Sequence, residues 1–267
     1  MIELPTKRRD VQNYNPKLLV LFGRPKSGKS SLMASLDSNL IIDLEDGYRA
    51  LSVMSVNVHN AQEIFEVANA VDAKIKEEGK FPYRFITIDN ATRLEEFSLP
   101  YAAHLYRNTA LGSGWGMLKD KAGNLIKDKN NKPMVDPNAD VRLIPQGAGY
   151  LFLRKAVRKM IDIFKDKCET LILVAHVKDK QIRKNDEEMS EMSVDLAGKL
   201  SDIICGEADA IGYVYRDKNK TMISFEGGDN TIREARPLHL RGKKIEVAHS
   251  NENNELIVDM SKVFIDG

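Results

Sequence analysis

The chain has 267 residues, of which 42% are hydrophobic and 30% charged, so it is long enough to bury a full core in one large domain. Its 40 basic and 39 acidic side chains give a formal net charge of +1. The protein therefore has no overall positive electrostatic field that would indicate nucleic acid as a partner. Any DNA or RNA binding must come from local patches of positive charge.

The same composition bears on the compartment in which the chain works. No apolar run approaches the length of a membrane span, and residues 1–16 are polar with mixed charge, unlike a signal peptide. Cys168 and Cys205 are too few and too scattered for a disulfide framework or a zinc site, and we interpret them as small buried hydrophobic residues. We expect a cytoplasmic protein in a reducing compartment, with no membrane partner.

The first predicted strand, residues 18–22, leads into the clearest motif of the chain. Residues 23–30 read Gly-Arg-Pro-Lys-Ser-Gly-Lys-Ser and fit the phosphate-binding loop template G-x-x-x-x-G-K-[ST] without a mismatch. A helix is predicted to start at residues 31–36, so the motif has the strand and helix context that its chemistry needs, and a mere surface turn is disfavoured. The residues expected to bind nucleotide are Gly23, Arg24, Pro25, Lys26, Ser27, Gly28, Lys29, Ser30 and Ser31. Lys29 is expected to reach the β and γ phosphates, and the Ser30 hydroxyl to ligate Mg²⁺.

Strand-like and helix-like patterns then alternate along the chain. We predict a strand at 40–44, a helix at 61–78, a strand at 84–89 and a helix that ends near residue 106. This alternation predicts an α/β fold with a mostly parallel sheet flanked by helices.

Residues 107–149 break this alternation, because the segment is rich in Gly, Asn, Lys and Asp and contains three prolines, Pro133, Pro137 and Pro145. We predict a long insertion that includes a protruding hairpin. After it we expect a helix at 150–165, a buried strand at 170–176, a mobile loop at 177–193, and a last core strand with a hairpin at 210–215 and 221–225. No fixed-period repeat is visible. We interpret residues 1–267 as a single domain, with a β-rich extension at about 217–267.

Three polar residues stand at the ends of predicted strands, where parallel strands present their side chains to a ligand. Asp89 is expected to hold the Mg²⁺ shell, although it or Asn90 could instead cap the next helix. Glu45 could polarise the attacking water, with Asp43 and Asp46 as nearby competitors and a solvated turn as the alternative. His176 could sense the γ-phosphate, or it could be a structural histidine.

In type and order, these strand ends resemble those of the RecA-like recombinase core. Ile42-Asp43-Leu44-Glu45 is similar to the RecA strand that ends in its catalytic glutamate, and Ile86-Thr87-Ile88-Asp89-Asn90 to its Mg²⁺-binding strand. Residues 171–176 stand where RecA places its γ-phosphate-sensing glutamine, which is His176 here. More closely, the chain resembles the phage-encoded RecA-like ATPases of the short single-domain type, grouped among single-strand annealing proteins. The features that carry this likeness are Glu45-Asp46-Gly47, Ala175-His176 and residues 208–213 followed by Arg216, and the resemblance covers about residues 17–240.

The resemblance implies a RecA-like P-loop NTPase core that uses ATP and Mg²⁺, with single-stranded DNA as partner. RecA-like proteins bind DNA through two loops, and the corresponding segments here are 107–149 and 177–193. Both contain cations, which also fit a merely solvated face. The residues expected at DNA are Trp115, Lys119, Lys121, Lys178, Lys180, Arg183 and Lys184. A single-strand DNA-binding protein and further copies of the chain are additional expected partners, and Arg216, Arg233 and Arg236 are candidates for completing a neighbouring site.

We therefore expect a Mg-dependent ATPase, with Lys29, Glu45 and His176 as catalytic residues, that acts on single-stranded DNA in phage recombination, annealing or replication, in the host cytoplasm. One alternative is a small-molecule phosphotransferase in which the insertion acts as a lid. Kinases of that type usually have an Arg-rich lid, whereas this insertion is rich in Lys and Asn. Another alternative is a nucleotide-gated interaction module that does not hydrolyse ATP.

Overall fold

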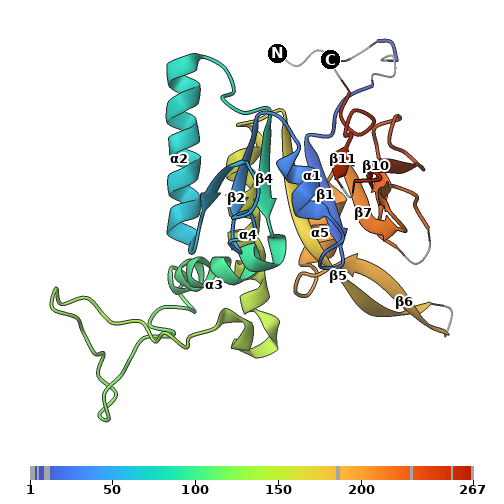
Figure 1. Ribbon diagram of the computed structural model, residues 1–267. Coiled ribbons are helices and arrows are strands. Elements are labelled where there is room, and N and C mark those ends of the chain that lie inside the picture. The colour runs from blue at the N-terminus through green and yellow to red at the C-terminus, as the bar shows by residue number, and fades with distance from the viewer. Residues whose placement is uncertain are drawn as a thin grey trace.

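The computed structural model describes residues 4, 6–8, 13–184, 187–228, 231–253 and 255–265, and within these ranges the side chains of 182–189 are not described. Eleven strands in this part of the chain form one sheet with helices on its faces (Figure 1). The fold is α/β, with a core of parallel strands flanked by helices.

The strands and helices follow one another in the order that the sequence pattern predicts, with additions. The elements are β1 (Leu18–Gly23), α1 (Lys29–Ala34), β2 (Asn39–Asp43), β3 (Met54–Asn57), α2 (Ala61–Glu78), β4 (Phe85–Asp89), α3 (Ala91–Arg107), two short 3-10 turns η1 (Val141–Leu143) and η2 (Pro145–Gly147), α4 (Gly149–Lys165), β5 (Thr170–Lys184), β6 (Glu187–Val194), α5 (Leu200–Glu207), β7 (Ala210–Asp217), β8 (Lys220–Ser224), β9 (Glu234–Ala235), β10 (Lys244–Ser250) and β11 (Leu256–Val258). The sequence did not predict β3, β6, α5, β9, β10 or β11.

The sheet has the strand order β11-β10-β8-β7-β1-β5-β4-β2-β3. The pairs from β7 to β3 are parallel, whereas β7, β8, β10 and β11 pair antiparallel with one another. Strand β5 lies between the strand that leads into the phosphate loop and the strand that ends in Asp89. The carboxyl ends of β1, β2, β4 and β5 therefore meet at one edge of the sheet.

The two faces of the sheet bury different cores. In β1, Leu18, Val20 and Phe22 point to one face, and Leu19 and Leu21 to the other, as alternation in a doubly covered strand requires. Helices α2 to α5 cover the first face, and α1 together with the C-terminal strands covers the second. The C-terminal segment is therefore part of the core, not an appendage.

Helix α2 illustrates how local sequence fixes an element. The Asn60 side chain accepts the Glu63 N–H at 3.0 Å, and Glu63 in turn accepts the His59 N–H at 2.7 Å, which satisfies two helix-end donors reciprocally. The helix ends at Gly79, whose φ of 69° suits a residue without a side chain. The predicted bounds of this helix, 61–78, are confirmed.

The prediction of a mobile loop at 177–193 is wrong. Strand β5 continues past the core and pairs antiparallel with β6 from Val177 opposite Val194 to Lys184 opposite Glu187. His176 is the last residue of β5 in the parallel register, opposite Gly23 of β1. The hairpin of β5 and β6 therefore starts directly after His176.

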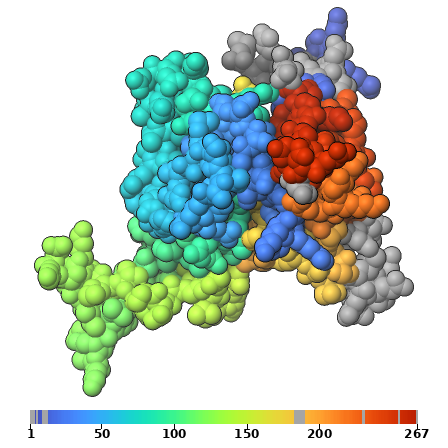
Figure 2. Space-filling view, viewed as in Figure 1, coloured from blue at the N-terminus to red at the C-terminus, as the bar shows by residue number. Residues whose placement is uncertain are grey.

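The insertion contains an extended arm, residues 116–139, that projects from the body beside α3 (Figures 1 and 2). The arm consists of turns of one kind, in which Asp120, Asp128 and Asp136 each accept a backbone N–H two residues ahead at 2.8–2.9 Å. The first two of these carboxylates also accept the N–H four residues ahead, from Asn124 and Lys132, at 2.9 Å. Such turns are typical of Asp, which can replace a backbone acceptor.

Backbone hydrogen bonds close the arm into a ring. Leu118 N–H donates to Met134 O, Met134 N–H to Ile126 O, and Ile126 N–H to Leu118 O, at 2.8–2.9 Å. The residues that close the ring, 118, 126 and 134, are eight positions apart, and so are the aspartates of the turns, 120, 128 and 136. The expectation of no fixed-period repeat is therefore wrong for this arm, and the predicted simple hairpin is instead a compact unit of linked turns.

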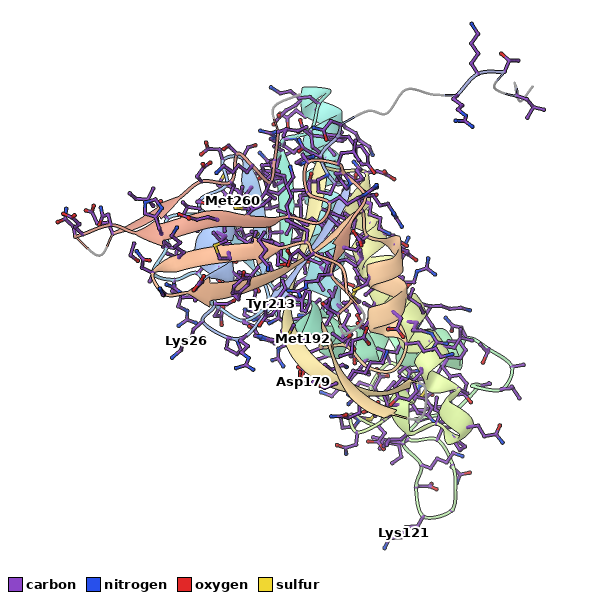
Figure 3. The ribbon with its side chains drawn as sticks, turned by 90° about the vertical axis from the view of Figure 1, so that its right-hand side faces the viewer. Lys26, Lys121, Asp179, Met192, Tyr213 and Met260 are labelled. Carbon is purple, nitrogen blue, oxygen red and sulfur yellow. The ribbon has the colours of Figure 1, made fainter. Side chains whose placement is uncertain are left out.

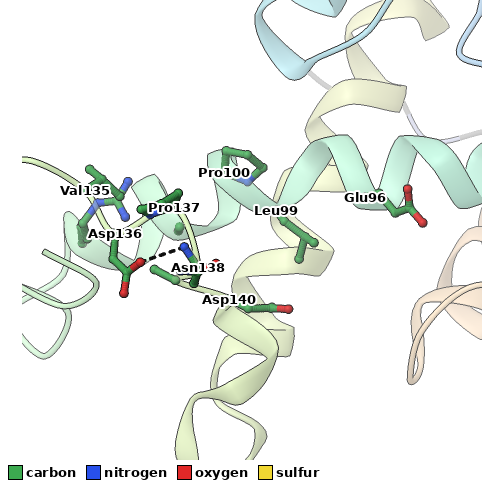
Figure 4. Close-up of a pocket in the computed structure, with 11 residues that line it drawn as sticks. Glu96, Leu99, Pro100, Val135, Asp136, Pro137, Asn138 and Asp140 are labelled. Atoms are coloured by element: carbon green, nitrogen blue, oxygen red, sulfur yellow. Dashed lines mark hydrogen bonds between the residues drawn. The ribbon is translucent and has the colours of Figure 1, made fainter. Parts of the chain in front are cut away.

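A cavity of about 470 Å³ separates the base of the arm from α3 (Figure 4). Leu99 and Pro100 of α3 line one side, and residues 135–140 line the other. It is lined by the arm and α3 only and does not include the phosphate loop.

Candidate active site

The phosphate loop connects β1 to α1 at the carboxyl edge of the sheet. A side chain at Gly23 would meet the Val214 carbonyl of β7 at 2.3 Å, so only glycine fits there. Gly28 has a φ of 101°, a left-handed conformation that also favours glycine. Between them, Ser27 has a buried hydroxyl without a hydrogen-bond partner among the described residues. An orphaned donor inside this loop fits a site built for phosphate oxygens.

Lys29 lies at the start of α1 and is largely enclosed. Its ammonium donates to the carbonyl oxygens of Gly23 and Arg24, both at 2.9 Å. Burial lowers the pKa of Lys29, while the nearby carboxylates of Asp89 and Glu45 act in the opposite direction. A cation is thus held across the loop, with two acidic side chains facing it.

Asp89 ends β4 opposite the loop. Its Oδ2 accepts the Ser30 hydroxyl at 3.3 Å and the Tyr48 hydroxyl at 2.6 Å. Burial raises the pKa of Asp89, while the bond from Tyr48 lowers it. Asp89 does not cap α3, because Asn90 does so by accepting the Arg93 N–H at 2.9 Å. The alternative role for Asp89 as a helix cap is therefore wrong.

The pair of Ser30 and Asp89 fits Mg²⁺ bound together with a triphosphate. Within the described residues, no group of three or more His, Cys, Asp or Glu side chains could hold a metal ion. Mg²⁺ usually takes only one or two protein oxygens and completes its shell with waters and substrate phosphates. A hydroxyl and a carboxylate 3.3 Å apart at the mouth of a phosphate loop match that preference.

Glu45 is presented by a tight turn after β2. The buried Asp43 carboxylate accepts the backbone N–H groups of Glu45, Gly47 and Tyr48 at 3.1–3.3 Å. This use of its oxygens makes Asp43 the organiser of the turn, whereas Asp46 pairs with Arg49 at 3.3 Å at the surface. Of the three acidic residues considered for the base, Glu45 is the one that acts on Lys29 and lies 3.9 Å from His176.

His176 lies next to Glu45 and Asn90. Its Nε2 is 3.1 Å from Asn90 Nδ2 and 3.9 Å from Glu45 Oε1. Because the Asn90 oxygen is engaged as the cap of α3, its amide nitrogen faces the ring and donates. His176 Nε2 is therefore the acceptor of this contact, while Nδ1 is buried without a hydrogen-bond partner among the described residues. The structure thus brings Lys29, Asp89, Glu45 and His176 to one edge, as the strand-end pattern predicts.

A cavity of about 550 Å³ opens beside Glu45. Leu44 and Asp46 continue its wall from the turn, and Thr92, Arg93 and Phe97 contribute from α3. Arg93 stacks its guanidinium over the Phe97 ring at 5.0 Å. Glu45 consequently has open space on one side.

The residues expected at DNA fall into distinct groups. Lys178 pairs with Asp195 at 3.6 Å and Lys180 with Asp202 at 3.1 Å. Trp115 is half-buried, edge-on to Tyr106 with ring centroids 5.3 Å apart. The side chains of Arg183 and Lys184 lie outside the described residues.

The lysines of the arm are different. The side chains of Lys119 and Lys121 are exposed and have no hydrogen-bond or ion-pair partner among the described residues, and the same holds for the side chains of Lys127, Lys129 and Lys132. Figure 3 shows Lys121 at the end of the arm, pointing away from the body.

The arginines considered for a neighbouring site have contacts within their own chain. Arg236 pairs with Asp209 at 3.3 Å, and Arg233 lies over the Tyr213 ring at 5.9 Å. Arg216 reaches the phosphate loop, with Nη2 3.8 Å from the position that a side-chain carbon of Gly28 would take.

Two residues of the site carry roles that we did not predict. Tyr48 follows Glu45 by three positions, and the sequence pattern does not predict its contact with Asp89. Asn90 was considered only as a cap, and its contact with His176 follows from the parallel register of β4 and β5.

A phosphate loop after β1 and an acidic residue at the end of β4, with β5 lying between the two strands, together define a P-loop nucleotide-binding protein. The chain belongs to the AAA domain family, whose model matches residues 15–236. Nucleotide binding is therefore the property that fold, site and family share.

Solved structures with a similar fold include the KaiC-like protein PH0186 from Pyrococcus horikoshii OT3, at 11% identity and a TM-score of 0.43, with 92% of this chain and 91% of that chain covered. The RadB recombinase is similar at 11% identity and a TM-score of 0.45, with 90% of each chain covered. A search of curated proteins found no match. No helix among the described residues has the length and apolar character needed to cross a membrane.

Proposed function

We propose that this protein binds and hydrolyses ATP with Mg²⁺ and couples the nucleotide to single-stranded DNA, in phage recombination, annealing or replication. The observation that carries the proposal is the meeting of Lys29, Ser30, Asp89, Glu45 and His176 at one edge of the sheet. The phosphate loop indicates a nucleoside triphosphate as the ligand. The carboxylates and the imidazole around the loop are the groups that would act in hydrolysis.

Each residue has a role that its position supports. Lys29 and the loop N–H groups would bind the phosphates, and Ser30 and Asp89 would hold the Mg²⁺. The bound ion would neutralise charge on the phosphates. Glu45, half exposed and next to a cavity, would orient and deprotonate the attacking water.

His176 is placed to report on the nucleotide. It contacts the Glu45 side of the site and is followed directly by the hairpin of β5 and β6. A change at His176 would thus reach the hairpin through one continuous strand. Coupling of hydrolysis to DNA affinity is proposed to use this route.

The arm supplies the cations that single-stranded DNA requires. Its lysines are unpaired among the described residues, while its aspartates are bound to their own backbone. Exposed cations that follow one another along a segment favour sequence-independent contact with phosphates. A single-strand DNA-binding protein and further copies of this chain are proposed as additional partners.

The phosphotransferase alternative receives less support. It needs the insertion to close over an acceptor at the phosphate loop, whereas the arm extends away from the body (Figures 1 and 3). The third alternative is nucleotide binding without turnover, and the measurement of phosphate release separates it from the proposal.

The test is phosphate release from Mg-ATP with and without single-stranded DNA, alongside DNA affinity and molecular mass with and without ATP. We expect turnover, a nucleotide-dependent DNA affinity, and loss of that dependence in the Lys29→Ala variant. DNA binding that is unaffected both by ATP and by Lys29→Ala would refute the coupling, and nucleotide binding without turnover would favour the interaction module.

A further inference from the structure

Tyr48 makes the shortest side-chain contact to Asp89. Its side chain is 3% exposed, and its hydroxyl donates to Asp89 Oδ2 at 2.6 Å. The Ser30 hydroxyl donates to the same oxygen at 3.3 Å. One carboxylate oxygen is therefore shared between the phosphate loop and the turn that follows β2.

A tyrosine in a core needs a partner for its hydroxyl, and this need alone would explain a contact with some acceptor. The position of Tyr48 is set by more than packing. Asp43 accepts the N–H groups of Glu45, Gly47 and Tyr48, and Asp46 within the turn has a φ of 58°. The turn is thereby fixed with Glu45 facing His176 and Tyr48 facing Asp89.

We propose that Tyr48 is a positioning residue for the metal site, which holds the Asp89 carboxylate for Mg²⁺ and links it to the turn that carries Glu45. This inference rests on the proposed binding of Mg-ATP. Partners that orient a metal-binding carboxylate contribute to metal affinity, and their loss typically weakens it by about 10- to 100-fold.

The test uses the full chain and the Tyr48→Phe variant, which removes only the hydroxyl. Binding of a fluorescent, non-hydrolysable ATP analogue is measured across a Mg²⁺ titration and again in EDTA. We expect the half-saturating Mg²⁺ concentration to rise about tenfold, while the affinity in EDTA stays that of the wild type. A structural role alone would not separate these two conditions.

Thr87→Val is the matched control. Thr87 lies on the same strand as Asp89, is fully buried, and donates to Asn39 Oδ1 at 2.9 Å away from the site. Its loss removes a buried hydroxyl without touching the carboxylate, so the Mg²⁺ titration should not move. An unchanged titration in Tyr48→Phe, or an equal change in both variants, overturns the inference.

A measurement on the wild type keeps the inference testable if Tyr48→Phe does not fold. The protein has eight tyrosines, and labelling them with carbon-13 at Cζ allows each hydroxyl environment to be followed by NMR. Adding Mg²⁺ to the nucleotide complex should move one tyrosine signal, and no movement contradicts the inference. Wild-type nucleotide binding that does not depend on Mg²⁺ would instead refute the proposed function itself.

Discussion

Lys29 shows at the level of one residue how the site handles a buried charge. Its ammonium is satisfied by two loop carbonyls at 2.9 Å and faces the carboxylates of Asp89 and Glu45. Burial alone lowers its pKa, so these acidic neighbours support the charged form. The loop therefore offers a triphosphate a cation that is already desolvated and held in place.

We predict that Lys29→Ala weakens ATP binding by about 10- to 100-fold, the range for losing a charged hydrogen bond. Lys80→Ala is the control, because Lys80 is exposed and lies outside the phosphate loop. Isothermal titration calorimetry of both variants would check this. Equal affinities in wild type and Lys29→Ala would show that the loop does not bind phosphates.

The site residues differ in how far the sequence could specify them. The loop is local, and Glu45, Asp89 and His176 were found because parallel strands bring their ends together. Tyr48 could not be found in this way, because its direction depends on the Asp43-centred turn and on the positive φ of Asp46. Contacts made through irregular backbone leave no periodic signal.

At the level of elements, the arm and the hairpin of β5 and β6 offer their lysines in different states. Lys178 and Lys180 are ion-paired with Asp195 and Asp202. The arm lysines have no such partners among the described residues. A DNA phosphate would have to displace a carboxylate at the hairpin but not at the arm.

We therefore predict that alanine at Lys119, Lys121, Lys127 and Lys129 weakens single-stranded DNA binding more than alanine at Lys178 and Lys180. Fluorescence anisotropy at several salt concentrations checks this. The slope of log affinity against log salt should fall by about 0.7 for each arm lysine that contacts a phosphate. The reverse order of the two variants would make the hairpin, and not the arm, the larger contributor to DNA affinity.

The turns of the arm should stabilise one another through their backbone ring. Asp128→Ala removes the acceptor of the Asn130 and Lys132 N–H groups, so we predict that the amides of Ile126 and Met134 exchange hydrogen about three- to tenfold faster. Lys129→Ala, in the same turn, is the control. Unchanged exchange in Asp128→Ala would mean that the turns do not depend on their carboxylates.

Strand β6 and the turns of the arm escaped prediction for the same physical reason. Helix α2 and strands β1, β2 and β4 have apolar positions at regular spacing, and they were predicted within about two residues. Strand β6 is mostly polar, and the arm turns rest on single aspartates, so neither shows hydrophobic periodicity. The eight-residue spacing of Asp120, Asp128 and Asp136 was the available signal for the arm.

On the scale of the whole molecule, helices and loops from distant parts of the chain are tied to the same sheet. Glu95 of α3 is one such tie, since it is buried and accepts the Ala197 N–H at 2.7 Å from the segment before α5. Burial raises the pKa of Glu95 above its ordinary value of 4.5, and the Ala197 N–H acts in the opposite direction. The folded state therefore binds this proton more tightly than the unfolded state.

A raised pKa in the folded state contributes stability that is present at low pH and lost as the pH rises through that pKa. We predict that, over the pH range that extends upward from about 4.5, wild type loses free energy of unfolding relative to Glu95→Gln, by at most about 1.4 kcal/mol per pH unit. Glutamine keeps an acceptor for Ala197 without the charge. Urea unfolding of both proteins across this range checks it, and a difference that is constant or grows with pH would contradict the sign.

Glu45→Gln tests most directly whether the protein is an ATPase, because this substitution keeps the shape of the side chain and removes the base. We predict that this variant binds Mg-ATP with the affinity of the wild type, whereas its rate of phosphate release falls by about 100-fold or more. Steady-state phosphate release measured beside nucleotide affinity gives both numbers from one preparation. Equal turnover in Glu45→Gln and wild type would contradict the assignment of Glu45, and absence of turnover in wild type would contradict the ATPase itself.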